Sequence, residues 1–403
     1  ARPALGAMSA AQALGAPAAP GCRGGEGKAD AGFGPQGQAP TGPACEGAAK
    51  IAKVDAHAHI GPGSEPRTIA LMDEWGIAQI VNVSGGYGPD VDVSARVKKD
   101  TGGRIRFMCN VDWSAWGTES FARTAIADLE RCRAMGGEGL KIFKGLGLKI
   151  SNPDGTLARV DDPVLDPVFE KAGEIGMPVL IHTGDPKAFF QPCDEKNERH
   201  AELEEHPSWC FHGEGNPSWE SLFGQYEARV ERHPGTTFIG AHFGNDPEDP
   251  ERVFEMLDAH PNLYVDTSAR LPEIGRFDPV RMRELFLSHA DRILFGTDIG
   301  IDEGMLALGS GPPYKPVRKE IARFFLSTWR YFETKDRDFE NPTPIQGEWK
   351  ISGIGLPCDV LEKVYHSNFE RLVAGIRAGA SGAGTGGGAA GAAGDAGGTG
   401  QGG

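Results

Sequence analysis

Short β-rich runs alternate with helical patterns along most of this chain, and this alternation restricts the fold more than any other feature. The eight runs are Ile51–His57, Ile77–Ser84, Ile105–Val111, Gly139–Phe143, Pro178–His182, Thr236–His242, Asn262–Asp266 and Ile293–Asp298. The helical patterns between them are Thr68–Trp75, Ser120–Met135, Pro163–Ile175, Leu222–His233, Pro250–Ala259 and Pro279–His289, with a less regular one at Val91–Lys99. Strands that alternate with helices are typical of parallel βα units.

Eight such units are the number that closes a (β/α)8 barrel, so we predict an α/β fold of the TIM-barrel type with its site at the carboxyl ends of the strands. A doubly wound open sheet is the alternative, but no Gly-x-Gly-x-x-Gly pattern follows the first strand. After the eighth strand we expect an irregular loop at Glu303–Pro313, an aromatic helix around Ile321–Phe332, a polar linker and a closing helix at Asp359–Arg377.

Composition divides the 403 residues into three parts. Residues 1–50 are rich in Ala, Gly and Pro, and residues 379–403 are almost entirely Gly and Ala. Neither segment can bury enough apolar surface to offset its chain entropy, so we predict two disordered arms. Residues 51–378 then form the barrel domain, which is close to the roughly 250 residues of such a domain plus insertions.

The overall charge restricts the partners. A formal net charge of −15 disfavours nucleic acid and anionic membrane surfaces, and no apolar run approaches the roughly 18 residues of a membrane span. We expect a small-molecule substrate, and a homodimer is compatible with the sequence. The chain begins with Ala1, so a cytoplasmic location and export with removal of a signal segment both stay open.

The seven cysteines are scattered and odd in number, which is not typical of a disulfide framework. Cys22 and Cys45 lie in the N-terminal arm. Cys193 and Cys210 flank a loop and could pair in an oxidising compartment, but we expect reduced thiols.

His57 and His59 lie at the carboxyl end of the first predicted strand. Side chains two residues apart share one face of a strand, so the two imidazoles point the same way. Gly61 and Pro62 stop the strand directly after them. Two imidazoles delivered together are the start of a zinc or transition-metal site. Asp55 is either a hydrogen-bonding partner of that site or a polar residue of the strand end.

Other residues that bind metals end later strands. His182 ends the fifth, His242 the sixth and Asp298 the eighth. Because the carboxyl ends of parallel barrel strands meet at one mouth, these side chains converge with the first pair. The sequence therefore predicts a metal site at the mouth rather than isolated structural histidines.

These motifs together resemble the amidohydrolase superfamily, in the amidohydrolase-related branch that contains aminocarboxymuconate semialdehyde decarboxylase. The resemblance covers Lys53 to about Arg377 and rests on Asp-Ala-His57-Ala-His59, Pro-Val-Leu-Ile-His182-Thr-Gly, the strand that ends in His242, and Gly-Thr-Asp298. The stretch Lys363-Val-Tyr-His-Ser-Asn368-Phe-Glu-Arg-Leu is similar to the terminal helix of that branch, with Phe369 where Ala is typical.

The resemblance implies that His57, His59, His182 and Asp298 bind one divalent metal ion, usually zinc with manganese as the alternative, and that His242 lies beside the metal-bound water. Such a ligand set leaves room for water and lowers its pKa. Asp298 can then take a proton, and His242 can orient hydroxide or stabilise developing charge. Asp298 and His242 are therefore the predicted catalytic residues.

Three cations are candidate substrate-binding residues. Lys141 and Lys144 are three apart on the fourth strand, so at most one should face the mouth. Some members of the superfamily carboxylate a lysine on this strand to bridge a second metal. A buried lysine could instead bind a substrate carboxylate or pair with a glutamate, and we expect one metal and no carboxylated lysine. Arg270, beyond the seventh strand, is either an anion clamp or surface charge.

Two long connections, Gly145–Asp162 and Thr183–Trp219, are candidate binding loops. The second carries Phe189 and Trp209, whose rings would supply a stacking wall for a planar substrate or would pack the insertion down. Trp113, after the third strand, is a further candidate for the pocket wall.

Two reactions fit this site. The predicted one is hydrolysis of an amide, ester or lactone of a small organic acid by a metal-activated water. The alternative is non-oxidative decarboxylation of an aromatic or unsaturated carboxylic acid, which would use the same metal. A non-catalytic binding protein on the same barrel is a third hypothesis, but it would lack a metal ligand and none is missing.

Overall fold

A computed structural model of the chain describes residues 42–184, 186–309, 311 and 314–374. Most of the predicted N-terminal arm and all of the predicted tail at 379–403 lie outside the described residues. None of the described helices is long and apolar enough to cross a membrane.

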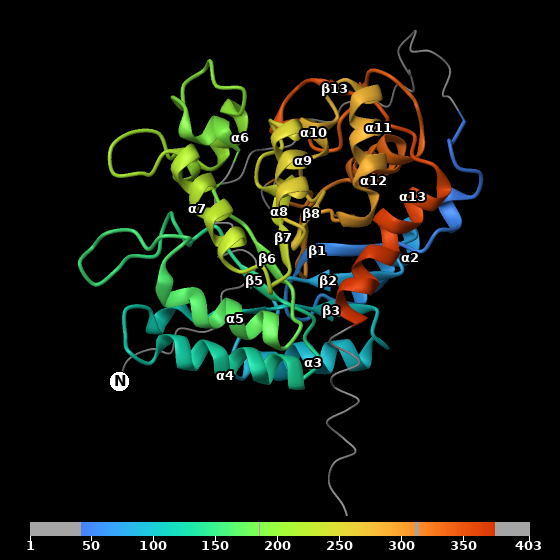
Figure 1. The fold of residues 1–403 in the computed structure, drawn as a ribbon. Coiled ribbons are helices and arrows are strands. Elements are labelled where there is room, and N and C mark those ends of the chain that lie inside the picture. The colour runs from blue at the N-terminus through green and yellow to red at the C-terminus, as the bar shows by residue number, and fades with distance from the viewer. Residues whose placement is uncertain (1–41, 185, 310, 312–313, 375–403) are drawn as a thin grey trace, which may run out of the picture.

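The described residues contain the eight-stranded parallel barrel that the alternating pattern predicts (Figure 1). Six strands are continuous: β1 Val54–Ile60, β2 Gln79–Asn82, β5 Leu140–Ile142, β6 Val179–Ile181, β7 Phe238–Gly240 and β8 Leu263–Asp266. The third barrel strand is split into β3 Ile105–Phe107 and β4 Cys109–Asn110, and the eighth into β9 Ile293–Leu294 and β10 Ile299–Ile301.

The two split strands close the ring. β3 pairs with β2 and β4 pairs with β5, whereas β9 pairs with β8 and β10 pairs with β1, all in parallel. The predicted strand Ile293–Asp298 is therefore wrong in its second half. Residues 295–298 leave the ladder, because Asp298 has a left-handed φ of 59° that no regular strand accommodates.

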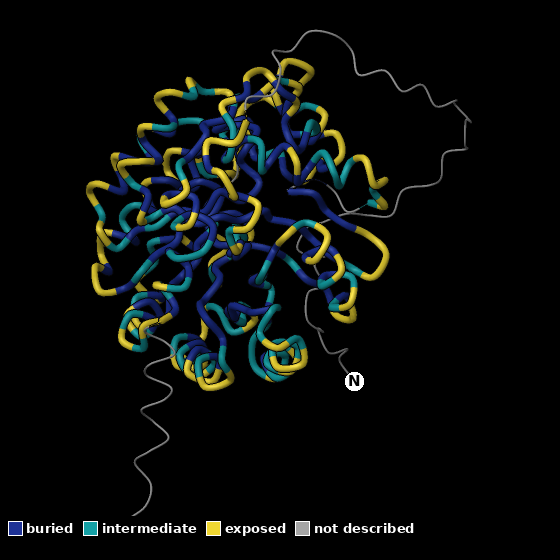
Figure 2. Tube along the Cα trace, turned by 90° about the vertical axis from the view of Figure 1, so that its right-hand side faces the viewer, coloured by how far each residue is buried: buried dark blue, intermediate teal, exposed yellow. Residues whose placement is uncertain are grey.

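Helices cover the outside of the barrel in the order predicted. They are α2 Glu65–Trp75, α3 Asp90–Asp100, α4 Phe121–Ala134, α5 Asp166–Glu174, α7 Trp219–Arg232, α9 Pro250–Ala259 and α11 Pro279–Ser288. Helices α3, α4 and α5 lie side by side along one flank. Buried residues gather around the strands and on the inner faces of these helices, and exposed residues lie on the rim (Figure 2). This is the pattern that amphipathic helices around one core produce.

Short elements connect these units. They are the α-helical turns α6 His200–Glu205 and α10 Leu271–Ile274, the left-handed turn α8 Ala241–Gly244, and the 3-10 turns η1 Ala48–Lys50, η2 Trp113–Ala115, η3 Pro163–Leu165, η4 Lys187–Phe190, η5 Pro207–Trp209, η6 Ala290–Arg292 and η7 Pro344–Gln346. After the barrel come β11 Leu306–Ala307, α12 Arg318–Glu333, the antiparallel pair β12 Phe339–Glu340 and β13 Lys350–Ile351, and α13 Cys358–Glu362.

The closing helix supports the break in the eighth strand. Beyond α13 it widens into a π-helix, η8 Lys363–Ser367, and continues as a helix over 368–374. The Phe295 N–H donates to the Val364 carbonyl at 2.9 Å, and the Asn368 amide donates to the Ile293 carbonyl at 2.8 Å. The helix therefore takes the hydrogen bonds that the strand loses there. Phe369 is buried beneath the Arg106 guanidinium, 4.7 Å from its ring.

Six of the seven cysteines form disulfides, so the expectation of reduced thiols is wrong. The pairs are Cys45–Cys358, Cys109–Cys132 and Cys193–Cys210, and Cys22 lies outside the described residues. Cys45 is buried, and the neighbouring Ala44 N–H donates to the Glu333 carbonyl at 2.7 Å. Residues 42–50 therefore dock on the barrel domain, in contrast to the disorder expected of this part of the arm.

Replacing Cys45 and Cys358 together by serine should lower the thermal unfolding midpoint by several degrees. The bridge joins residues 313 positions apart, and cross-links of this kind stabilise proteins by about 2–4 kcal/mol. Thermal unfolding of the double variant and of the unchanged protein measures the difference. Deletion of residues 1–41 is the control and should leave the midpoint in place. An unchanged midpoint for the double variant would show that the bridge adds no stability.

Candidate metal centre

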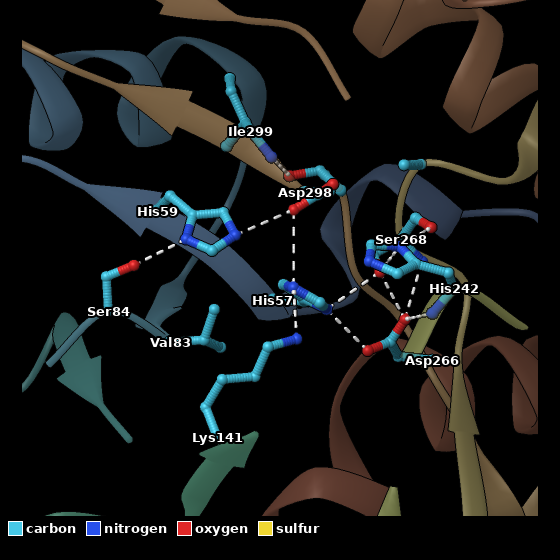
Figure 3. A network of polar contacts seen from close by, with 12 residues as sticks. His57, His59, Val83, Ser84, Lys141, His242, Asp266, Ser268, Asp298 and Ile299 are labelled. Carbon is cyan, nitrogen blue, oxygen red and sulfur yellow. Dashed lines mark hydrogen bonds and ion pairs between the residues drawn. The ribbon is translucent and has the colours of Figure 1, made fainter. Parts of the chain in front are cut away.

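His57 and His59 point from β1 toward Asp298. The strand runs to Ile60, three residues beyond the predicted end, so both histidines lie within it and share its inner face. The Nε2 atom of His59 lies 3.2 Å from Asp298 Oδ1, and the Nε2 atom of His57 lies 3.5 Å from the same oxygen (Figure 3). Among the described residues, these three form a group whose ligand atoms all lie within 4.8 Å of one another.

This donor set fits a divalent metal ion. Ligand atoms about 2.1 Å from one tetrahedral ion lie about 3.4 Å apart, and the two measured separations, 3.2 and 3.5 Å, bracket that value. The outer ring nitrogens are occupied, because His57 Nδ1 lies 2.9 Å from Asp266 Oδ2 and His59 Nδ1 lies 2.7 Å from Ser84 Oγ. The Nε2 atoms are therefore left to face the ion.

Asp298 occupies a strained turn that the surrounding chain holds in place. Its N–H donates to the His57 carbonyl at 2.8 Å despite its left-handed φ of 59°. Gly296 lets this turn approach β1, because a Cβ there would lie 3.2 Å from the Cβ atoms of His57 and Ser268. Positive φ at a non-glycine residue persists only where neighbouring contacts dictate it.

Asp55 holds the backbone of β1 and the turn at Thr297 together and does not hydrogen bond to an imidazole ring in the contacts below. Its carboxylate accepts from the backbone N–H groups of His57 and Thr297 at 3.2 and 3.0 Å and from the Thr297 hydroxyl at 2.6 Å. Burial raises the pKa of Asp55 to about 7, although these hydrogen bonds act in the opposite direction. The two alternatives in the sequence are thus decided in favour of strand-end structure.

His242 stands in a left-handed turn directly after β7. His242 and Phe243 have φ values of 54° and 57°, and the His242 N–H donates to Asp266 Oδ1 at 3.0 Å. Burial holds the pKa of the His242 imidazole well below its usual value, and the neighbouring His182 adds to this effect. His242 is therefore a neutral imidazole in this site.

His182 follows β6 and lies against His242, with the two ring centroids 4.2 Å apart. Burial, followed by the positive charges of Lys141, Lys144 and Arg270, holds the pKa of His182 well below its usual value. His182 does not belong to the close group of three within the described residues. The structure thus brings it to the same mouth, and its role as a fourth ligand stays a prediction.

The candidate cations gather around the same histidines. Lys141 is buried on β5 with its Nζ atom 3.3 Å from His57 Nε2, and burial lowers its pKa to about 8. Lys144 lies beyond the end of β5, so strand alternation does not govern it, and its Nζ atom lies 4.1 Å from the Trp209 ring centroid. Arg270 is 3% exposed and is therefore not surface charge.

The candidate aromatic residues mostly pack the polypeptide. Phe189 and Trp209 are 1% and 3% exposed, with ring centroids 5.8 Å apart, and Trp209 also stacks on His206. Trp113 packs against Trp116 and Phe121. Packing of the insertion accounts for the burial of Phe189 and Trp209, and the Trp209 ring also contacts one of the three candidate cations, Lys144.

Three residues of the site were not predicted: Ser84, Asp266 and Ser268. Ser84 ends the second predicted strand and Asp266 the seventh, so the rule that found His182 and Asp298 applies to them too. Ser268 carries no such signal, because it lies beyond the strand. Its hydroxyl lies 3.0 Å from His57 Nδ1 and 3.1 Å from His242 Nδ1. The turn after β8 brings the hydroxyl to this position.

A family model described as Amidohydrolase matches residues 54–374 of this chain. A search of curated proteins found no match. Solved structures with similar folds include an uncharacterised TIM-barrel protein from Bordetella bronchiseptica, with 17% identity, a TM-score of 0.48, and coverage of 81% of this chain and 100% of the other.

Two further similar structures are decarboxylases. The 2,6-dihydroxybenzoate decarboxylase from Rhizobium has 16% identity and a TM-score of 0.48, with coverage of 80% of this chain and 98% of the other. The 5-carboxyvanillate decarboxylase from Novosphingobium aromaticivorans, which has bound manganese, has 13% identity and a TM-score of 0.46, with coverage of 82% and 99%. These similarities are too low to assign a reaction or a metal.

Proposed function

Because this chain belongs to the amidohydrolase family and is an enzyme, we propose that it hydrolyses an amide, ester or lactone of a small organic acid with the help of one divalent metal ion. The observation that carries the proposal is the convergence of His57 Nε2, His59 Nε2 and Asp298 Oδ1 beside the neutral imidazole of His242. Nitrogen ligands favour zinc among the abundant metals, and manganese is the alternative.

His57, His59 and Asp298, with His182 as the proposed fourth ligand, would hold an ion that supplies positive charge to acidify a water molecule and polarise a carbonyl. Burial alone would raise the pKa of Asp298, but the histidines that surround it, His59 first among them, hold it well below its usual value. The ionised carboxylate can accept a proton from the attacking water and pass it to the leaving group.

His242 is placed to accept a proton from the same water. Its Nδ1 atom lies 3.1 Å from the Ser268 carbonyl oxygen, which can only accept, so the proton of the neutral ring lies on Nδ1. The Nε2 atom is then a proton acceptor. A neutral imidazole in this state can take a proton from water and return it in a later step.

Lys141 and Arg270 are proposed to bind a carboxylate of the substrate. Both are buried next to the histidines, and a buried cation gains most from an anionic partner because water screens it little. Lys144, with its ammonium over Trp209, adds positive charge at the same mouth. The site is thereby suited to an organic acid.

Replacing Lys141 by methionine should raise KM for an acidic substrate about 10- to 100-fold, the typical effect of losing a hydrogen bond to a charged group. Steady-state kinetics on the acid and on an uncharged analogue would measure the effect. The same change at Lys171, which pairs with Glu174 on the outside of α5, is the matched control and should leave KM unchanged. Equal losses for the acid and the uncharged analogue would contradict the carboxylate role.

Decarboxylation is the second candidate, because the same cations would also hold a carboxylate close to the metal ligands. An assay of metal-loaded enzyme over a panel of aromatic acids, lactones, esters and amides, with CO₂ release and acid release measured in parallel, separates the two reactions. We expect acid release. CO₂ release without acid release would replace hydrolysis by decarboxylation, and inactivity on the whole panel would count against both.

The disulfides favour export over a cytoplasmic location. Disulfides persist in oxidising compartments and are rare where glutathione and thioredoxin keep thiols reduced, and this fold contains three. Thiol labelling of protein from its natural source, followed by mass spectrometry, would test this. Labelling of all six cysteines of these three pairs without prior reduction would argue for a reducing compartment.

A further inference from the structure

The Asp266 carboxylate joins three strand ends in the interior of the site. Asp266 ends β8 and is fully buried. Its Oδ2 atom lies 2.9 Å from His57 Nδ1 within β1, and its Oδ1 atom accepts from the His242 N–H after β7 at 3.0 Å (Figure 3). Oδ1 also accepts from the Ser268 N–H at 3.0 Å and from the Ser268 hydroxyl at 2.5 Å. One carboxylate thus holds groups from two other strands.

These contacts determine which ring nitrogen of His57 carries the proton. An ionised carboxylate can only accept hydrogen bonds, so a neutral His57 must carry its proton on Nδ1 and donate it to Asp266. The Nε2 atom is then unprotonated on the side of Asp298, from which it is 3.5 Å away. This is the protonation state that a metal requires of an imidazole ligand.

The same carboxylate acts on His242 through Ser268. By accepting from the Ser268 N–H and hydroxyl, Asp266 fixes the turn that presents the Ser268 carbonyl to His242 Nδ1 at 3.1 Å. That carbonyl places the proton of His242 on Nδ1. The hydrogen bond to the His242 N–H also supports the left-handed backbone of this residue.

We infer that Asp266 is a positioning residue that sets the proton positions of His57 and His242 together, so that one nitrogen binds metal and the other accepts a proton. The inference rests on the proposed function, because it assumes that His57 is a metal ligand. The opposing view is that Asp266 only stabilises the fold. A purely structural carboxylate would affect the melting temperature but not the protonation of the two rings or the affinity for metal.

The first test measures the protonation directly. Nitrogen-15 NMR of histidine side chains in the metal-free protein distinguishes a proton on Nδ1 from one on Nε2. We expect Nδ1–H for both His57 and His242, assigned by comparison with the His57→Asn and His242→Asn variants. A proton on Nε2 of either ring would overturn the inference, and this measurement needs no Asp266 variant to fold.

The second test titrates Co²⁺ into metal-free unchanged protein and into the Asp266→Asn variant. Asparagine keeps an acceptor for the His242 N–H but turns a donor toward His57 Nδ1, so the proton of His57 moves to the metal side. We expect cobalt affinity to fall about 10- to 100-fold, as is typical for a lost partner of a metal-binding histidine, with altered cobalt absorption bands. Ser268→Ala, which keeps the Asp266–His57 contact, should have a smaller effect.

The matched control is Asp336→Asn, which replaces another buried carboxylate, paired with Arg330 outside the site. It should lower stability but bind Co²⁺ like the unchanged protein. Equal cobalt affinity and identical spectra for Asp266→Asn and the unchanged protein would overturn the inference. Failure of the unchanged protein itself to bind Co²⁺ would instead count against the proposed function.

Discussion

Replacing Asp298 by alanine should cost the enzyme both its metal and its turnover. Asp298 Oδ1 lies 3.2 and 3.5 Å from the two Nε2 atoms of the β1 histidines, so its loss leaves the two imidazoles without the carboxylate that balances an ion's charge. It also removes the proposed proton carrier, whose contribution to rate is typically 10²- to 10⁴-fold. Elemental analysis and single-turnover rates on the same folded sample measure both losses.

Asp298→Asn is the companion variant for this experiment. Residue 298 has a left-handed φ of 59°, and asparagine tolerates this conformation better than alanine. The asparagine variant therefore separates the loss of the carboxylate from backbone strain, and it should also lose metal and turnover. A metal-loaded and fully active Asp298→Asn enzyme would show that the Asp298 carboxylate is neither a metal ligand nor the proton carrier.

Replacing His242 by alanine should leave the metal in place and still lower turnover by about 10²- to 10⁴-fold. Within the described part of the chain, His242 lies outside the close group of His57, His59 and Asp298, and we propose that, unlike His182, it acts on the water and not on the ion. The expected loss comes from the missing proton acceptor. Metal content and single-turnover rate, measured together, separate this outcome from that of Asp298.

Two variants control for structural effects at His242. His242→Asn suits the φ of 54° and should match the alanine variant in activity. His289→Ala removes a histidine on the outside of the barrel that pairs with Asp258 and should leave activity unchanged. A metal-free His242→Asn protein would make His242 a ligand. A metal-loaded variant with full activity would show that His242 has no part in the chemistry.

Local patterns in the sequence determined the barrel and the three candidate metal-binding residues that lie closest together. The alternation of strands and helices needs only the periodicity of apolar residues, and every helix predicted within the barrel is present. His57, His59 and Asp298 follow from the same patterns, because parallel strands carry their last residues to one mouth. The position of Asp266 could have been predicted in the same way, because it also ends a strand.

Contacts between distant segments were decided only by the tertiary structure. The Cys45–Cys358 bridge joins residues 313 positions apart, and no spacing rule predicts such a pair. Whether Lys141 or Lys144 lies next to His57 depended on where β5 ends. The ends of strands and helices are the features that local propensity defines least well. The burial of Phe189 and Trp209 depended on how the insertion folds onto the barrel.

The hydrogen bonds of the site were also decided only by the tertiary structure. Ser268 reaches two histidines only because the turns after β7 and β8 adopt left-handed backbone at His242 and Ala269. Such conformations oppose local preference and persist only where surrounding contacts dictate them. The sequence by itself therefore determined which strands carry the candidate metal-binding residues, whereas the packing of neighbouring strand ends decided how those residues are oriented and which hydrogen bonds they make.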